Sequence, residues 1–376
     1  MNRAPIVTFS HLRWSPMFRR PHHIMSRLAA DRDVLYVEEP VPHHGEAALE
    51  VVRVAPRLQV VQPRLPIGSG GFGPEQQAAL ALALRKLLRD QGWDRFVAWL
   101  YSPIAVVVAQ ALGPRAIVYD CMEQISALRF APLELRERER ELMSCADVVF
   151  AGGPSLYHTK REAHHSVYCF PNSVDMAHFA GAKGTPEAGE QEEIPRPRLG
   201  YFGAIDDRMD LEILRALSAE RPDWQIILVG PVMKIDASRL PRAANIHYMG
   251  QRSYGDLPAF LAGWDACLLP FALSAATRYL CPEKALEYMA SDRPVVSTPI
   301  VDVAEPYGDI VYLGRGPVGF LEACEKALHD FGSSRSIRRA LAAQVLRQTS
   351  WEETVLRMSG ILSRLGGVRP KARLAS

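Results

Sequence analysis

One stretch decides the fold class: Asn245-Ile-His-Tyr-Met-Gly250, then Tyr254-Gly-Asp-Leu-Pro258, Trp264-Asp-Ala-Cys-Leu-Leu-Pro-Phe271, Pro282-Glu-Lys-Ala-Leu-Glu-Tyr-Met-Ala290 and Arg293-Pro-Val-Val-Ser-Thr298. Its residue types predict a strand, a glycine turn, a helix, a second strand, a polar loop, a second helix and a third strand. Strands that alternate with helices are typical of a parallel sheet with right-handed crossovers. We therefore expect a doubly wound α/β domain here.

Two charged residues of this stretch, Lys284 and Glu287, are spaced so that they share one face of the predicted helix. Ligands of such sheets bind beyond the carboxyl ends of the strands, so Lys284 is expected to bind an anion and Glu287 sugar hydroxyls. The alternative is the solvated face of an amphipathic helix. Pro282 marks a defined helix start after the polar loop 274–279 and favours a ligand contact for Glu287. The pattern suggests a nucleotide-sugar site.

The rest of the chain predicts a second domain of the same kind. Short apolar runs between residues 6 and 151, separated by helical patterns, indicate a first α/β domain over 1–178. A segment rich in Gly, Pro and acidic residues predicts a linker at 179–197, followed by the second domain at 198–349. Ser350 and Glu353 form a capping-box pattern that opens a helix at 350–368, and a disordered tail is expected at 369–376.

Length and composition agree with two domains. A chain of 376 residues exceeds one ordinary core, and a net charge of +2 argues against nucleic acid as a partner. Six cysteines without a CxxC pair indicate reduced thiols and a cytoplasmic location. We expect no membrane-spanning helix and no signal segment, and at most peripheral contact at the inner membrane face.

Further candidates follow predicted strands. The turn Gly200-Tyr-Phe-Gly203 would let a backbone approach closely, and Arg208 would complement a diphosphate; the alternative is a plain turn with a solvated arginine. Asp120 and Glu123 follow another strand and are the catalytic candidates, because a carboxylate there can accept a hydroxyl proton. Asp120 alternatively caps the next helix.

The first strand leads into the candidate acceptor side, which comprises Trp14, Arg20, His22 and His23. These residues are expected to bind an anionic group and a sugar or lipid face, or to be structural. Adjacent histidines diverge and no HExxH spacing is present, so no metal site is predicted. Membrane contact through the loop 14–20 and the helix 136–140 is a second hypothesis, although the alternating charges of that helix favour a solvated face. For Glu38 and Glu39, hydroxyl binding and solvation both stay open.

Several pieces together resemble the group 1 glycosyltransferases of the GT-B fold, in the family 4-like set. They are Trp14 with Arg20-Pro-His-His23, Tyr36-Val-Glu-Glu-Pro40, Tyr119-Asp-Cys121, Ala146-Asp-Val-Val-Phe150, Pro171-Asn-Ser-Val-Asp175, Gly200-Tyr-Phe-Gly203 and the stretch 245–298. The pattern is most similar to a bacterial subgroup for cell-wall and exopolysaccharide assembly, such as the teichuronic acid glycosyltransferases. The resemblance covers nearly the whole chain.

The resemblance implies two Rossmann-like doubly wound parallel-sheet domains that face each other across a cleft. The first would bind the acceptor and the second a nucleoside-diphosphate sugar, with a last helix that returns to the first domain. Glu287 would hold the ribose hydroxyls, and Arg208 with Lys284 the diphosphate. The candidate donor contacts are Gly203, Arg208, Gly250, Tyr254, Thr277, Arg278, Lys284 and Glu287. Such enzymes generally need neither metal nor cofactor.

Two departures from the family pattern matter. The first of the family's paired glutamates would fall at Tyr279, which is not a carboxylate, and Asp292 stands where relatives usually have glycine. The expected activity is transfer of a sugar to a glycan or lipid-linked glycan hydroxyl, with retained anomeric configuration, in polysaccharide biosynthesis. The alternatives are a nucleotide-sugar epimerase of the same fold, or a non-catalytic sugar-nucleotide-binding partner.

Overall fold

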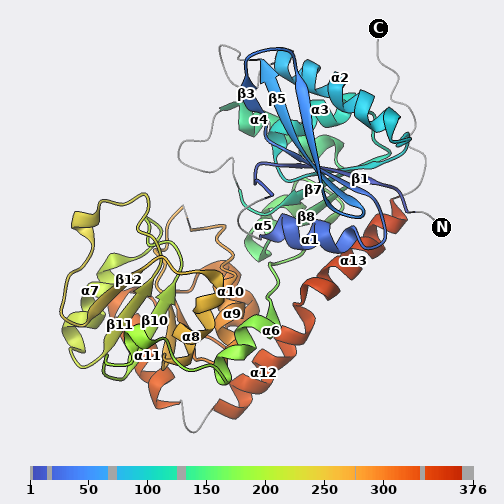
Figure 1. Cartoon of the computed structure of the whole chain (residues 1–376). Coiled ribbons are helices and arrows are strands. Elements are labelled where there is room, and N and C mark those ends of the chain that lie inside the picture. Colours follow the sequence, from blue (N-terminus) through green and yellow to red (C-terminus); the bar gives the residue numbers. More distant parts are fainter. Residues whose placement is uncertain are drawn as a thin grey trace. The chain divides into compact units, whose positions relative to one another are not determined.

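The computed structural model describes residues 3–14, 19–66, 74–124, 133–275, 277–330 and 335–365. The chain forms two compact units (Figure 1). The first contains the chain up to Gly152, Leu156–Phe170 and the residues from Trp351 onward. The second contains Gly153–Ser155 and Pro171–Ser350. The predicted α/β class with two parallel-sheet domains is confirmed.

The first unit is built on a nine-stranded sheet within the described residues, in the order β3-β5-β2-β1-β6-β7-β8-β9, with β4 paired to β5. Its strands are β1 (Ile6–Ser10), β2 (Val34–Glu38), β3 (Val41–His43), β4 (Ala48–Ala55), β5 (Leu58–Pro66), β6 (Val97–Leu100), β7 (Ala116–Cys121), β8 (Val148–Ala151) and β9 (Val167–Cys169). All pairs are parallel except β4 with β5. The central strands are buried along their whole length, which explains their unbroken apolar sequences.

The helices of this unit connect successive strands. They are α1 (Arg20–Leu28), α2 (Pro74–Asp90), η1 (Pro103–Ala105), α3 (Val106–Ala111), α4 (Leu133–Cys145) and α5 (Pro154–Arg161), with α13 (Trp351–Arg364) added from the far end of the chain. The buried residues of α13 recur at helical spacing: Trp351, Val355, Met358 and Leu362. This stripe packs on α1, where the His23 ring stacks on Trp351 with 4.6 Å between ring centroids. The tail expected at 369–376 lies outside the described residues.

The second unit contains a parallel sheet in the order β12-β11-β10-β13-β14-β15. The strands are β10 (Arg198–Phe202), β11 (Gln225–Val229), β12 (Ile246–Gly250), β13 (Ala266–Leu269), β14 (Val295–Ser297) and β15 (Tyr312–Leu313). The helices are α6 (Met176–Ala180), η3 (Gly181–Lys183), η4 (Gly189–Gln191), α7 (Leu211–Glu220), η5 (Ala237–Arg239), η6 (Tyr254–Asp256), α8 (Leu257–Ala262), α9 (Lys284–Ala290), α10 (Val301–Tyr307), α11 (Gly316–His329) and α12 (Arg335–Gln348). The strand order reverses direction between β10 and β13, which makes a topological switch point.

The segment 179–197 differs from the expected linker, because it belongs to the second unit. Gln191 within it is fully buried; its amide donates to the Phe260 carbonyl at 3.0 Å and its carbonyl oxygen accepts from the Trp264 indole at 3.1 Å. The unit boundary accordingly falls between Phe170 and Pro171 instead of near residue 178. The composition of the segment suggested little to bury, but one well-paired polar side chain is enough to fix it against the core.

Candidate functional site

Three glycines shape the carboxyl edge of the second sheet. Gly203, Gly230 and Gly250 lie at the ends of β10, β11 and β12, with φ angles of 131°, 150° and 71°. The Gly203 amide donates to Val229 at 2.8 Å, and the Gly230 amide donates to the Gly250 carbonyl at 2.8 Å. A β-carbon on Gly230 would lie 2.0 Å from the Gly203 oxygen, so only glycine fits. Gly230 was not among the sequence candidates, although Gly-Pro after an apolar strand is a signal for such a turn.

Lys284, the first residue of α9, covers the Gly203 turn. A β-carbon on Gly203 would lie 2.3 Å from Lys284 Cε and 2.9 Å from its Nζ. The helix is fixed in this place by Tyr288, whose hydroxyl accepts a hydrogen bond from the Phe202 amide at 3.0 Å. Two of the candidate donor contacts, Gly203 and Lys284, therefore lie together, and their binding of a donor stays a prediction.

Glu287 lies one helical turn after Lys284 and is partly buried. Burial raises the pKa of its carboxyl group from 4.5 to about 8, the Lys284 charge opposes this rise and the Glu283 charge adds to it. Such surroundings favour the protonated form of a carboxyl group, which can both donate and accept hydrogen bonds. Perturbed carboxyl groups of this kind are concentrated at functional sites.

Tyr254 adds an aromatic surface to the same neighbourhood. Its side chain is 52% exposed, and its ring stacks on His178 with 4.1 Å between centroids and 11° between planes. Burial raises the pKa of the Tyr254 hydroxyl, and the charges of Glu287, Asp175 and Glu283 raise it further. Tyr254 and Glu287 are thus electrostatic neighbours. His178 was not predicted, because no local sequence pattern links it to a residue so far along the chain.

Arg208 lies on the loop that follows Gly203. It pairs with Asp206 at 2.6 Å and is 38% exposed, and its carbonyl accepts from the Ala272 amide at 2.8 Å. Burial raises the pKa of the Tyr201 hydroxyl, the Asp206 charge adds to this rise and the Arg208 charge opposes it. The same hydroxyl would lie 3.1 Å from a β-carbon on Gly203. The arginine therefore belongs to this edge of the sheet, with its charge partly offset by Asp206.

The loop that precedes α9 is held by its own side chains. Thr277 is 2% exposed; its hydroxyl accepts from the Ser274 amide at 3.0 Å and donates to the Ala272 carbonyl. This placement favours a structural role for Thr277 over a donor contact. Arg278 is exposed, with its guanidinium 5.4 Å from the centre of the Tyr279 ring. Gly203, Tyr254, Lys284 and Glu287 are thus brought together, and Gly250 contributes backbone to the same edge.

In the first unit, Arg20 and Asp120 form a buried ion pair. Arg20 is 2% exposed and Asp120 is 0% exposed, and Arg20 Nε and Nη2 lie 3.1 and 2.9 Å from Asp120 Oδ1. The same guanidinium donates to the Phe170 carbonyl at 2.7 Å. Burial raises the Asp120 pKa and the Arg20 charge opposes the rise. The pair joins α1 to β7, a placement that favours structural roles over the predicted catalytic and acceptor-side roles. Glu123 is exposed.

The other acceptor-side candidates also have partners within the first unit. His22 is fully buried; its Nδ1 accepts from the Arg19 amide at 2.9 Å and its Nε2 lies 2.8 Å from the Arg13 carbonyl. Trp14 meets the His22 and Tyr36 rings edge-on, each with 4.9 Å between centroids. With His23 stacked on α13, the structural alternative is favoured for all three.

The membrane hypothesis rested on two segments. Residues 15–18, the centre of the first segment, lie outside the described residues. In the second, Arg138 pairs with Glu134 at 3.5 Å and Glu141 at 2.9 Å, as expected for a solvated helix face. Among the residues that the structure covers, no helix has the length and apolar character needed to span a bilayer.

Asp292, for which the family resemblance implies glycine, has a φ of 62°. Glycine adopts this left-handed backbone more easily than other residues. The aspartate is held there by ion pairs with Arg339 and, at 3.5 Å, with Lys183.

Comparison with known proteins agrees with this geometry. Residues 196–330 match the family model of the Glycosyl transferases group 1. TuaH of Bacillus subtilis strain 168, a protein assigned as a teichuronic acid biosynthesis glycosyltransferase, is 22% identical over 66% of this chain and 68% of its own length.

Among solved structures, sucrose-phosphate synthase from Thermosynechococcus elongatus superposes with a TM-score of 0.72 at 17% identity, over 96% of this chain and 99% of that one. A trehalose-6-phosphate protein of E. coli bound with UDP-2-fluoro glucose gives a TM-score of 0.71 at 12% identity, over 98% and 100%. Anabaena Alr3699/HepE in complex with UDP and glucose gives 0.67 at 15%, over 96% and 100%. The expected GT-B fold and the resemblance seen in the sequence are confirmed.

Proposed function

We propose that this chain, a group 1 glycosyltransferase of the GT-B fold, transfers a sugar from a nucleoside-diphosphate donor to a hydroxyl of a glycan or lipid-linked glycan. The predicted enzyme class is confirmed by the family match over residues 196–330 and by the similarity to TuaH. Retention of anomeric configuration, a role in polysaccharide biosynthesis and peripheral action at the cytoplasmic membrane face belong to the proposal.

One observation carries the donor assignment: Lys284 lies directly over the Gly203 turn, with Glu287 one helical turn further on. This place is the switch point of the second sheet, where α/β proteins bind their ligands. A glycine there leaves room for the Lys284 side chain against the backbone, and the ammonium group would offset the charge of a diphosphate bound beside it. In this proposal Glu287 exchanges hydrogen bonds with ribose hydroxyls.

The chemistry that follows is stabilisation of a leaving group. When the sugar–phosphate bond breaks, negative charge develops on the diphosphate, and a cation already fixed in place lowers the barrier. Lys284 would supply that charge and Arg208 would add to it, which supports transfer without a metal or cofactor. Two of the structural neighbours were solved with UDP-2-fluoro glucose and with UDP and glucose, which supports a uridine diphosphate sugar as the first donor to test.

The test measures nucleotide binding and turnover separately. UDP, GDP and dTDP are screened by thermal shift, because a ligand that binds the native state raises the melting temperature. Release of nucleoside diphosphate from the matching sugar donor is then followed with acceptor extracts. Lys284→Ala and Glu287→Ala should each abolish the shift and the release, whereas Lys326→Ala and Glu322→Ala, at exposed positions of α11, should keep both.

Two outcomes would contradict the proposal. If no nucleoside diphosphate shifts the melting temperature, the assignment of the donor site is wrong. If the donor is isomerised without an acceptor, as judged by NMR of the sugar ring, the epimerase alternative is correct. A variant at Glu287 that keeps full turnover would remove the proposed ribose contact.

A further inference from the structure

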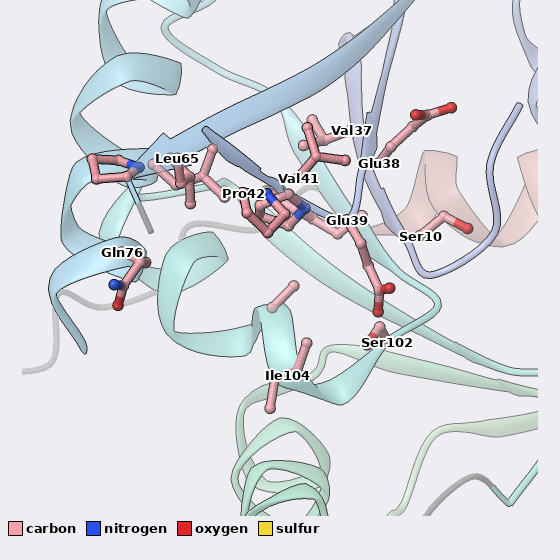
Figure 2. Close-up of a pocket in the computed structure, with 15 residues that line it drawn as sticks. Ser10, Val37, Glu38, Glu39, Val41, Pro42, Leu65, Gln76, Ser102 and Ile104 are labelled. Carbon is pink, nitrogen blue, oxygen red and sulfur yellow. The ribbon is translucent and has the colours of Figure 1, made fainter. Parts of the chain in front are cut away.

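A cavity of about 380 Å³ lies within the first unit (Figure 2). Pockets of this size suit a small molecule or one group of a larger one. Its walls are formed by residues of β1, β2, β3, β5, α2 and η1 and of the turns that follow β2 and β6. None of the residues assigned to the donor site lines it.

The cavity is located at the carboxyl ends of strands. Ser10 ends β1, Glu39 follows β2 and Ser102 follows β6. β1 pairs with β2 on one side and with β6 on the other, so the strand order of the first sheet reverses here. This is the switch point of the first sheet, where a ligand is expected on topological grounds.

The walls divide into an apolar part and a polar part. Leu65, Leu80 and Ile104, from β5, α2 and η1, provide aliphatic surface. Figure 2 shows Ser10, Glu39 and Ser102 on the side of the cavity opposite to Leu65. Gln76 lies on the same side as Leu65, so a ligand that fills this space meets mostly apolar atoms and one amide at that end, and carboxyl and hydroxyl groups at the other.

Charge narrows the ligand class further. The described lining contains two carboxylates and no lysine or arginine. Glu38 accepts from Arg13 at 2.9 Å, from the Trp14 amide at 2.8 Å and from Gln62 at 3.1 Å, so its oxygens are already engaged. Glu39 is more exposed; partial burial raises the pKa of its carboxyl group and the Arg13 charge opposes this rise. Arg13, which is not part of the lining, is paired with Glu38 and donates to the Glu39 carbonyl at 2.6 Å. A phosphate or carboxylate placed here would therefore face the Glu39 carboxylate with no lysine or arginine among the described lining residues.

We propose that this cavity binds the acceptor and that the acceptor carries an uncharged apolar group beside a hydroxylated head, which faces Glu39, Ser10 and Ser102. The identification of the ligand as the acceptor rests on the proposed transferase function. The ligand class that fits the lining residues is an alkyl or aryl group joined to a neutral polyol. Hydroxyl groups of the head would donate to Glu39 and exchange hydrogen bonds with the two serines.

The experiment measures binding of simple probes by isothermal titration calorimetry, without donor. n-Octyl β-D-glucopyranoside and phenyl β-D-glucopyranoside, kept below any micelle-forming concentration, represent alkyl and aryl ligands. Methyl β-D-glucopyranoside lacks the apolar group, and octyl phosphate keeps the alkyl group but replaces the head by an anion. We expect the octyl or the phenyl glucoside to bind about tenfold or more tightly than either comparison probe.

Variants locate the binding. Ile104→Trp and Gln76→Trp, both at partly buried lining positions, fill the cavity from η1 and from α2 and should each weaken binding about tenfold. Glu39→Gln should weaken binding of the glucoside head, whereas Glu46→Gln, an exposed carboxylate outside the cavity, should leave the affinity unchanged. Circular dichroism shows whether each variant is folded, and two independent tryptophan substitutions keep the test valid if one fails to fold.

Several results would overturn the inference: binding of octyl phosphate as tight as that of octyl glucoside, equal affinity for the methyl glucoside, no effect of either tryptophan in a folded protein, or no binding of any probe. These results leave the donor site unaffected. Conversely, a chain that binds octyl glucoside in this cavity but shows no thermal shift with any nucleoside diphosphate would contradict the transferase proposal and not the ligand chemistry of the cavity.

Discussion

Gly203 and Lys284 share one surface: a β-carbon added to the glycine would lie 2.3 Å from Cε of the lysine. The two residues are far apart in sequence, and they meet because α9 starts over the end of β10. A shift of the Gly203 turn would therefore move the Lys284 side chain as well.

Gly203→Ala is expected to displace Lys284 and to strain a backbone whose φ is 131°. We predict a loss of about 1–3 kcal/mol in the free energy of unfolding, and a loss of nucleoside-diphosphate binding in the fraction that stays folded. Urea unfolding and thermal shift measure the two effects. Gly181→Ala is the control, since its φ is −57° and no atom lies within 4 Å of an added β-carbon. Equal behaviour of the two variants would contradict the prediction.

The raised pKa of Glu287 predicts a pH dependence of stability. Because its pKa rises from 4.5 in the unfolded chain to about 8, the native state binds more protons between these values. The contribution of the protonated group is fully present below pH 4.5 and is lost as the pH rises through about 8. In Glu287→Gln the free energy of unfolding should fall less steeply over this interval than in the wild type.

Urea titrations across the interval measure this slope. Glu322→Gln, at an exposed position of α11, should behave as the wild type. A wild-type slope that matches Glu287→Gln would show that the carboxyl group is not desolvated.

The Arg20–Asp120 pair allows a decision between structural and catalytic roles. Asp120→Asn leaves Arg20 buried without a counter-charge and should reduce the free energy of unfolding by about 3–5 kcal/mol. Arg20→Met with Asp120→Leu should lose less than the sum of the single changes, because neither charge is left alone. Glu50→Gln, in an exposed pair with Arg64, should cost no more than about 1 kcal/mol. Unchanged stability with lost turnover in Asp120→Asn would instead support catalysis.

Gln191 tests whether the segment 179–197 is part of the second unit. Gln191→Ala leaves the buried Trp264 indole without its partner and should cost about 1–3 kcal/mol. Gln251→Ala, an exposed glutamine of the same unit, is the control and should change the unfolding midpoint little. Identical midpoints for both variants would restore the interpretation as a linker.

Strand and helix types were predictable where the apolar pattern was continuous. β13 and α9 lie where the stretch 245–298 placed them, because buried parallel strands need unbroken apolar sequence. The hairpin of β4 and β5 was not expected: β4 is largely exposed and shows no clear alternation, so its sequence has no burial pattern. The packing of Gln191 could not be predicted either, because it depends on two backbone carbonyls and an indole distant in sequence.

Site residues could be predicted where the local sequence explains why that residue type is needed. Gly203 and Lys284 follow from a strand end and a helix start, and both lie at one edge of the sheet. Arg20 and His22 were assigned to a ligand because they follow a strand, yet both are buried. Sequence position indicates the edge of a sheet, but whether a side chain turns outward or inward depends on partners such as Asp120, which only the structure identifies.

The membership of α13 in the first unit has a consequence for biosynthesis. The apolar stripe formed by Trp351, Val355, Met358 and Leu362 leaves the ribosome only after all of the second unit. Until then, the surface of α1 that α13 contacts lacks this helix. The second unit can therefore finish folding before the first unit has its final helix. A fragment that stops at Phe170 would expose an apolar surface and be prone to self-association.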